Sequence, residues 1–148
     1  MTCVKTYSLQ LVGTDRLHFN ITRIPVYVAH NPGGTSAQNM LHFAQGVNTD
    51  AFQKFDYGSA IENMKYYNQT TPPLYHAEDL HVPVMVYSGG NDSLADRDDI
   101  EWLLNHLPAA NLLGHMTFPE WDHLDFIWAF DAAKYLYSDI IKRIFMPY

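Results

Sequence analysis

The sequence predicts an α/β fold, in which parallel strands alternate with helices. A continuous apolar run at residues 82–88 is followed by a loop and an amphipathic segment, and the same succession starts again at residue 111. A strand that is buried on both faces of a parallel sheet has such an uninterrupted apolar pattern. The order strand, helix, strand, helix is typical of a doubly wound sheet.

Composition limits the class of protein further. The chain has 148 residues, 47% of them hydrophobic, which is enough for one domain with a core. A net charge of −7 argues against a surface for nucleic acid or anionic lipid. We expect no transmembrane segment, because no apolar run approaches the ~20 residues of a membrane span. The opening residues do not resemble a signal peptide, so passage into the secretory pathway is not expected from this sequence.

The first half of the chain predicts one strand and two helices, after residues 1–23, which carry few clear signals. The β-rich run 24–29, IPVYVA, favours a short strand. Thr35 or Ser36 can cap a helix. Its apolar positions would be Met40, Leu41, Phe43, Ala44 and Val47. Residues 59–69 predict a second short helix, which the following Thr-Thr-Pro-Pro should stop.

The second half predicts two strands, each followed by a helix. Residues 82–88 form the first strand, with Pro83 near its start. The helix at 94–107 has an acidic first turn and an apolar stripe made of Ile100, Leu103, Leu104 and Leu107. Residues 111–118 form the second strand. The last segment is helical in its second part, with Asp131 as the N-cap and a buried stripe of Tyr135, Leu136, Ile140, Ile141 and Ile144.

Two candidate catalytic side chains follow these strands. Asp92 lies four residues past Ser88, and His123 lies five residues past Phe118. Functional groups in such sheets lie on the loops beyond the carboxyl ends of the strands, so we expect Asp92 and His123 to meet. A carboxylate that holds one imidazole nitrogen fixes the tautomer and stabilises the imidazolium, as in a Ser-His-Asp triad.

Structural roles remain open for both residues, because a single aspartate after a strand is commonly a turn residue and a single loop histidine commonly lies on the surface. Asp96 competes with Asp92, but its position in the first helical turn already has a structural explanation. Gly89 and Gly90 allow a sharp turn with unusual dihedral angles, which would aim Asp92. The aromatic residues around His123 are expected to pack the loop and the helix that follows it.

The nucleophile for such a pair is not evident in the sequence. No G-x-S-x-G elbow occurs, and the nearest imitation, Gly34-Thr-Ser-Ala-Gln, lacks the second glycine. Ser36 is therefore a weak candidate, and a helix cap explains it. Cys3 is the only cysteine, so no internal disulfide and no cysteine-based zinc site are expected. The histidine spacings indicate no metal site, and we expect no cofactor.

Four stretches resemble the acid lipases, the α/β-hydrolase family that contains gastric and lysosomal acid lipase. They are HNPGGTSAQNMLHFAQ, FQKFDYGSAIENMKYYNQTTPPLY, VPVMVYSGGNDSLAD and PEWDHLDFIWAFDA. The resemblance runs from about residue 20 to the end and implies the C-terminal portion of the hydrolase fold. Residues 1–75 would be a cap (lid) segment and residues 76–148 the last strands and helices of the core. Asp92 would be the triad aspartate and His123 the triad histidine.

The resemblance also implies function and two departures. Relatives would hydrolyse triacylglycerols or cholesteryl esters. The N-terminal two thirds of the family pattern, with the serine and the oxyanion-hole loop, is absent, so we expect the chain to be inactive alone. The first strand would then have a bare apolar edge, which favours poor solubility, partial unfolding or a protein partner. A cap disulfide would be lost, because Val12 stands where the partner of Cys3 is expected.

Three functions therefore stay open: part of an ester hydrolase, a non-catalytic module that binds a partner through its cap or strand edge, and a small serine hydrolase that uses Ser36. The family is secreted or lysosomal. Asn20 and Asn68 begin N-glycosylation triplets, and so does Asn91, where a neighbouring catalytic Asp92 would disfavour a glycan.

Overall fold

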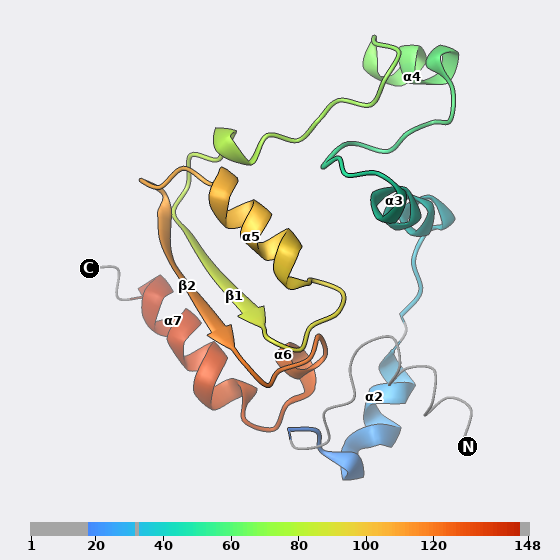
Figure 1. The fold of residues 1–148 in the computed structure, drawn as a ribbon. Helices are drawn as coiled ribbons and strands as arrows, with labels where there is room; N and C mark the ends of the chain where they lie inside the picture. Colours follow the sequence, from blue (N-terminus) through green and yellow to red (C-terminus); the bar gives the residue numbers. More distant parts are fainter. Residues whose placement is uncertain (1–17, 32, 146–148) are drawn as a thin grey trace.

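The structure is a computed structural model that describes residues 18–31 and 33–145. Cys3 and Val12, the positions of the lost cap disulfide, lie outside these residues. Strands β1 (Val84–Gly89) and β2 (Leu112–Phe118) run side by side, and helices α5 (Arg97–His106) and α7 (Ser138–Phe145) flank the pair (Figure 1). Helices α2 (Ile24–His30), α3 (Ala37–Asn48) and α4 (Ala60–Tyr67) form an arm that starts beside α6 (Asp125–Trp128) and returns from α4 to β1 (Figure 1).

The two strands pair in parallel, which confirms the predicted α/β class and the order strand, helix, strand, helix. Val84 pairs with Leu112 at the start and Gly89 with Phe118 at the end. Burial on both faces is only partly realised: Val86 and Ser88 are buried, whereas β2 alternates between half-buried and exposed residues. One face of β2 therefore meets solvent, because no described element covers it.

The core lies on the other face, between the strands and the C-terminal helical segment. Its buried members are Trp121, Ala129, Ala132 and Leu136, with Tyr87, Phe118, Phe126 and Ile140 packed against them. The Tyr87 hydroxyl donates a hydrogen bond to Asp139 of α7 at 2.6 Å. The segment enters α7 through a π-helical turn at Ala133–Tyr137, preceded by the short helix α6 (Asp125–Trp128).

The predicted C-terminal stripe is only partly buried. Leu136 and Ile140 pack into the core, but Tyr135, Ile141 and Ile144 are 49%, 55% and 63% exposed. The stripe was predicted from periodicity, which marks an apolar face but does not supply the element that covers it. The backbone oxygen of Asp131 accepts helical hydrogen bonds from Lys134 and Tyr135, while its side chain contacts His18 at 3.2 Å instead of capping the helix.

The predicted strand at residues 24–29 is wrong. These residues form helix α2 (Ile24–His30), preceded by the 3-10 turn η1 (Ile21–Arg23). Pro25 suits a helix start, because its fixed backbone angle is helical and its missing N–H is not needed there. No strand in the described part of the chain pairs with this segment, whereas a helix satisfies its backbone groups internally.

Both helices that were predicted in the first half are confirmed. Helix α3 (Ala37–Asn48) is capped by Ser36, and helix α4 (Ala60–Tyr67) is capped by Ser59. Helix α4 ends earlier than expected, because Asn68 adopts a left-handed conformation with φ of 57° before the Thr-Thr-Pro-Pro sequence is reached. The chain then passes from α4 to β1 through the 3-10 turn η2 (Ala77–Asp79).

The start of the arm is tied to the segment that follows His123. Phe19 forms a β-bridge with Ala129, and the amide of Phe130 donates to the backbone oxygen of His18 at 3.0 Å. The Tyr27 and Trp128 rings stack with centroids 4.8 Å apart. Two regions about a hundred residues apart in the sequence thus form one packed unit.

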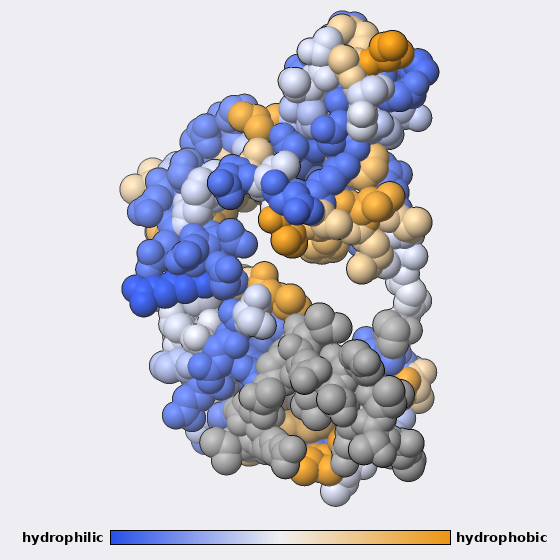
Figure 2. Space-filling view, turned by 45° about the vertical axis from the view of Figure 1, so that its right-hand side comes forward, coloured by the Kyte–Doolittle hydropathy of each residue, from blue (hydrophilic) through white to orange (hydrophobic). Residues whose placement is uncertain are grey.

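Much apolar surface stays uncovered. The accessible surface of the chain is 11018 Å², whereas a compact monomer of this mass exposes about 7,700 Å². Helix α3 illustrates the excess: its apolar side chains Met40, Leu41, Phe43 and Val47 are all more than half exposed. Hydrophobic surface is visible in several separate places in Figure 2. The chain therefore has surface that a further protein segment could bury.

Candidate functional site

Asp92 and His123 meet beyond the carboxyl ends of β1 and β2, as the sequence predicted. The Nδ1 atom of His123 lies 3.0 Å from Oδ2 of Asp92. The carboxylate side chain is 4% exposed, whereas the imidazole is 43% exposed. Its Nε2 atom forms no hydrogen bond with any described residue, so one ring nitrogen is held and the other is left for a further partner.

Local turns fix the carboxylate of Asp92. Its Oδ1 atom accepts hydrogen bonds from the amides of Leu94 and Ala95, both at 2.9 Å. These bonds keep Oδ2 directed at the imidazole. Asp96, the competing aspartate, has the structural role that its position indicated, since it caps α5 by accepting from the amide of Asp99 at 3.0 Å.

Gly89 and Gly90 bring the two loops together, but not through unusual dihedral angles. Neither has a positive φ; among the described glycines only Gly34, Gly58 and Gly114 do. A Cβ at Gly89 would collide with the backbone oxygen of Trp121, and a Cβ at Gly90 would collide with the backbone of Pro119. The expected reason was therefore wrong: these positions exclude side chains because another backbone segment lies against them.

Backbone hydrogen bonds join the loops at this close approach. The Gly90 amide donates to Phe118 at 2.9 Å, and the Asn91 amide donates to the backbone oxygen of Trp121 at 3.1 Å. Asn91 also donates from its side chain to Glu120 at 3.2 Å. The residue before Asp92 is thus bonded to the residue two positions before His123, which sets the spacing of the Asp-His pair.

The turn that contains His123 is closed by Asp122 and Asp125. The Asp122 amide donates to Oδ2 of Asp125 at 2.8 Å, and the Asp125 amide donates back to the Asp122 oxygen at 3.1 Å. Both residues are buried. Sequence reasoning missed this pair, although two acidic residues three positions apart around a loop histidine are visible in the sequence.

The aromatic residues around the loop pack it in place, as expected. Trp121 is 3% exposed and stacks on Phe118 with ring centroids 4.1 Å apart. Phe126 meets Trp121 edge-on at 5.2 Å. Aromatic pairs in these geometries add to the stability from burial, so the packed rings of Phe118, Trp121 and Phe126 hold the loop in place.

Ser36 does not join the Asp-His pair. Its Oγ atom accepts a hydrogen bond from the Asn39 amide at 3.0 Å, as a helix cap does. Helix α3 lies away from the ends of β1 and β2 (Figure 1). A different hydroxyl, that of buried Ser88, lies 2.7 Å from Nε2 of His115 on the sheet face, where no described carboxylate hydrogen-bonds the ring.

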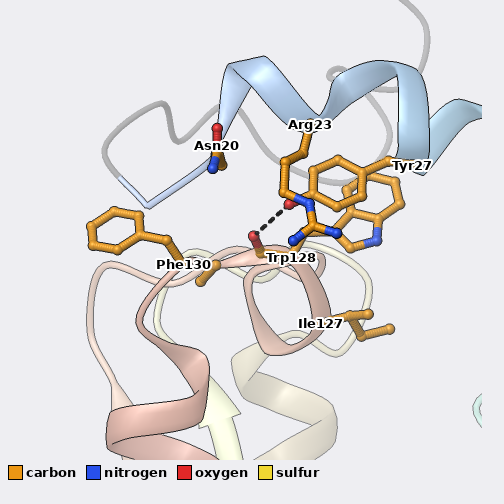
Figure 3. Close-up of a pocket in the computed structure, with 7 residues that line it drawn as sticks. Asn20, Arg23, Tyr27, Ile127, Trp128 and Phe130 are labelled. Carbon is orange, nitrogen blue, oxygen red and sulfur yellow. Dashed lines mark hydrogen bonds between the residues drawn. The ribbon is translucent and has the colours of Figure 1, made fainter.

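A cavity of about 440 Å³ lies beside α6 and does not include Asp92 or His123. Its lining comes from η1, α2 and the segment after His123: Asn20, Arg23, Tyr27, Ile127, Trp128, Ala129 and Phe130. Figure 3 shows Tyr27 over Trp128, with the Tyr27 hydroxyl bonded to the Trp128 oxygen at 3.5 Å. One wall of the cavity is therefore formed by α6, the helix that follows the His123 loop.

No three His, Cys, Asp or Glu side chains in residues 18–31 and 33–145 are grouped to hold a metal ion. None of the helices in that part of the chain is long and apolar enough to cross a membrane.

The chain is similar to known lipases along most of its length. It is 46% identical over 132 residues to gastric triacylglycerol lipase of Bos taurus, covering 89% of this chain and 33% of that protein. It is 49% identical to lysosomal acid lipase/cholesteryl ester hydrolase of Macaca fascicularis and 48% identical to that of Homo sapiens, with the same coverage. The chain thus spans about a third of the length of the curated relatives it matches. No family model matches it.

Proposed function

Because the chain belongs to the gastric and lysosomal acid lipase family, we propose that it carries the aspartate and histidine of a lipase catalytic triad. The observation that supports this role is the 3.0 Å contact between His123 and Asp92 beyond the ends of adjacent parallel strands. Residues 1–75 are the cap segment of this proposal, and residues 76–148 are the C-terminal part of the hydrolase core.

In the proposed reaction, Nε2 of His123 removes the proton from a serine hydroxyl as the serine attacks the ester carbonyl. The same nitrogen then gives the proton to the alkoxide that leaves. Asp92 accepts the Nδ1–H, which keeps Nε2 unprotonated before the attack and stabilises the imidazolium afterwards. The Asp92 carboxylate is buried and accepts three hydrogen bonds, which suits a group that holds the imidazole. The His123 ring is 43% exposed, which suits a group that transfers a proton.

The serine of this proposal lies outside residues 1–148, because these contain no G-x-S-x-G elbow. The substrate class is carboxylic esters of lipids, since relatives bear the names triacylglycerol lipase and cholesteryl ester hydrolase. Residues 1–148 alone are then inactive, because both the nucleophile and the oxyanion donors are missing. Covalent labelling of Ser36 by a fluorophosphonate, with ester hydrolysis by the chain alone, would overturn this part of the proposal.

A chimera tests the triad directly. Residues 1–148 replace the matching third of gastric triacylglycerol lipase of Bos taurus, which then supplies the rest of the enzyme. We expect hydrolysis of a triacylglycerol, and a loss on the order of 10⁴-fold for His123→Ala and for Asp92→Ala. His76→Ala is the matched control, because the His76 imidazole is exposed and its one described hydrogen bond is with the side chain of Glu78. A chimera that keeps its rate without His123 would disprove the assignment.

A second candidate function is a module that binds a protein partner. The large exposed apolar surface favours it. The free edge of β1 favours it too, because β2 is the only described strand that pairs with β1. The partner of this alternative is a lipase of the same family. Mixing the chain with full-length gastric triacylglycerol lipase and measuring the mass of the species tests it. A monomeric chain with no complex would exclude this alternative.

Glycosylation at Asn20 and Asn68 belongs to the same proposal. Asn68 is exposed at the left-handed end of α4, where an attached sugar meets no packed surface. The Asn20 side chain accepts hydrogen bonds from the amide and hydroxyl of Thr22. Mass spectrometry of the chimera secreted from animal cells tests both positions, with Asn→Gln variants as controls.

A further inference from the structure

We propose that Asp125 is a positioning residue for the Asp-His pair: its carboxylate closes the turn that aims His123 at Asp92. This inference rests on the proposed function, because it assigns a role within the same site. It concerns a residue two positions after His123 whose carboxylate accepts the Asp122 amide, so the proposed role is to position the backbone of the His123 turn.

The need for such a residue follows from how little else holds the imidazole. The His123 side chain is 43% exposed, so packing restrains it weakly. Its one described hydrogen bond is that to Asp92. The direction of the ring is therefore set mainly by the backbone from which it projects, and a small rotation of that turn would separate Nδ1 from Oδ2.

That backbone is anchored on both sides of His123. Two residues before it, the Trp121 oxygen accepts the Asn91 amide at 3.1 Å, which joins the turn to the Asp92 loop. Two residues after it, the Asp125 carboxylate accepts the Asp122 amide at 2.8 Å. The backbone around His123 is thus held on one side by the hydrogen bond between Asn91 and Trp121. On the other side it is held by the hydrogen bond between Asp122 and the Asp125 carboxylate.

The second anchor works in both directions. The Asp125 amide donates to the Asp122 oxygen at 3.1 Å, while the Asp125 carboxylate accepts the Asp122 amide, so the two residues close one turn reciprocally. The backbone oxygen of Asp125 accepts a hydrogen bond from the amide of Ala129, a core residue, at 3.1 Å. The turn that carries His123 is therefore connected to the core through Asp125.

Burial makes a purely local capping role a poor explanation. Asp125 is 3% exposed, whereas Asp96, which caps the much longer helix α5, is exposed. Removing a carboxylate from water is unfavourable unless its hydrogen bonds are specific and strong. A four-residue helix such as α6 has little to gain from a buried charge. The bond from the Asp122 amide places this buried carboxylate where it holds the turn beside the Asp-His pair.

The imidazole tautomer reports this role without any catalysis. With ¹⁵N-histidine in residues 1–148 at neutral pH, Nδ1 of neutral His123 should carry the proton, because Asp92 accepts it. Asp125→Ala should lose this Nδ1–H signature, as Asp92→Asn does. Asp125→Asn should keep it, because its amide oxygen still accepts the Asp122 amide. Asp96→Ala, which removes a cap from α5 but does not contact the His123 turn, should also keep it.

A folded Asp125→Ala variant with the wild-type His123 signature would overturn the inference. If that variant does not fold, the wild-type chain decides: the Asp122 amide should exchange slowly with solvent, and exchange as fast as in exposed loops would reject the anchor. In the chimera, Asp125→Ala should lower kcat on the order of 100-fold with little change in KM, and Asp125→Asn should restore it. A chimera that never hydrolyses esters rejects the triad, while the tautomer result still decides the role of Asp125.

Discussion

Replacing Gly90 by alanine tests whether close backbone approach assembles the site. A Cβ at this position would lie 2.8 Å from both the carbonyl carbon and Cα of Pro119, and closer still to its oxygen. Backbone atoms cannot swing aside as a flexible side chain does. The loop after β1 must therefore move away from the loop after β2, which carries His123.

The expected destabilisation has two parts. Overpacking in a close contact costs about 1–3 kcal/mol. The movement also stretches the hydrogen bonds from Gly90 to Phe118 and from Asn91 to Trp121, which measure 2.9 and 3.1 Å, and each contributes about 1 kcal/mol. If both hydrogen bonds are lost, we therefore expect Gly90→Ala to lower the free energy of unfolding by about 3–5 kcal/mol.

Urea denaturation followed by tryptophan fluorescence measures this change, and amide exchange at Asn91 shows whether the loops have separated. Gly46→Ala is the matched control, because a Cβ at Gly46 in α3 meets no atom within 4 Å. That variant should gain about 0.5–1 kcal/mol of helix stability, seen as unchanged or stronger far-ultraviolet circular dichroism. If Gly90→Ala unfolds at the wild-type urea concentration with Asn91 still protected, the reasoning about the close approach is wrong.

Two other predictions follow from contacts outside the Asp-His pair. Trp128→Ala removes the stack on Tyr27, so we expect a loss of about 0.5–1.5 kcal/mol from this ring pair and faster proteolysis within α2; unchanged proteolysis would contradict the packing of α2 on α6. The Arg143 guanidinium, and then the Tyr87 hydroxyl, hold the pKa of the Asp139 carboxyl below its ordinary value of 3.8. Their contribution is present above that value and is lost as the pH falls through the lower pKa of the folded state. Melting temperatures measured between pH 6 and pH 2.5 should fall less steeply for Asp139→Asn than for the wild type; equal slopes would refute this.

Local sequence signals predicted the elements that need no distant partner. Ser36 was one of the two residues predicted to cap the helix after it, and it caps α3. Ser59 and Asp96 cap α4 and α5 in the same way, although neither was predicted as a cap. The meeting of Asp92 and His123 was predictable for a related reason: parallel strands end at the same edge of a sheet, so the residues after two successive strands become neighbours.

Tertiary packing decided what these signals could not. The run IPVYVA suits a strand or a helix by composition, and it is a helix because no described strand pairs with it while Tyr27 stacks on Trp128. The spacing of Asp122 and Asp125 is visible in the sequence, but their burial beside His123 depends on the core that forms around Trp121.

The sequence by itself determined the α/β class, the cap of α3 and the two residues of the Asp-His pair, because hydrophobic period, capping and strand order act through residues close in the chain. Only the tertiary structure decided why Gly89 and Gly90 must lack side chains and which part of the C-terminal stripe is buried. Those outcomes depend on which surface lies opposite each residue. A one-dimensional pattern can indicate an apolar face, but the distance to the segment packed against it is a property of the fold.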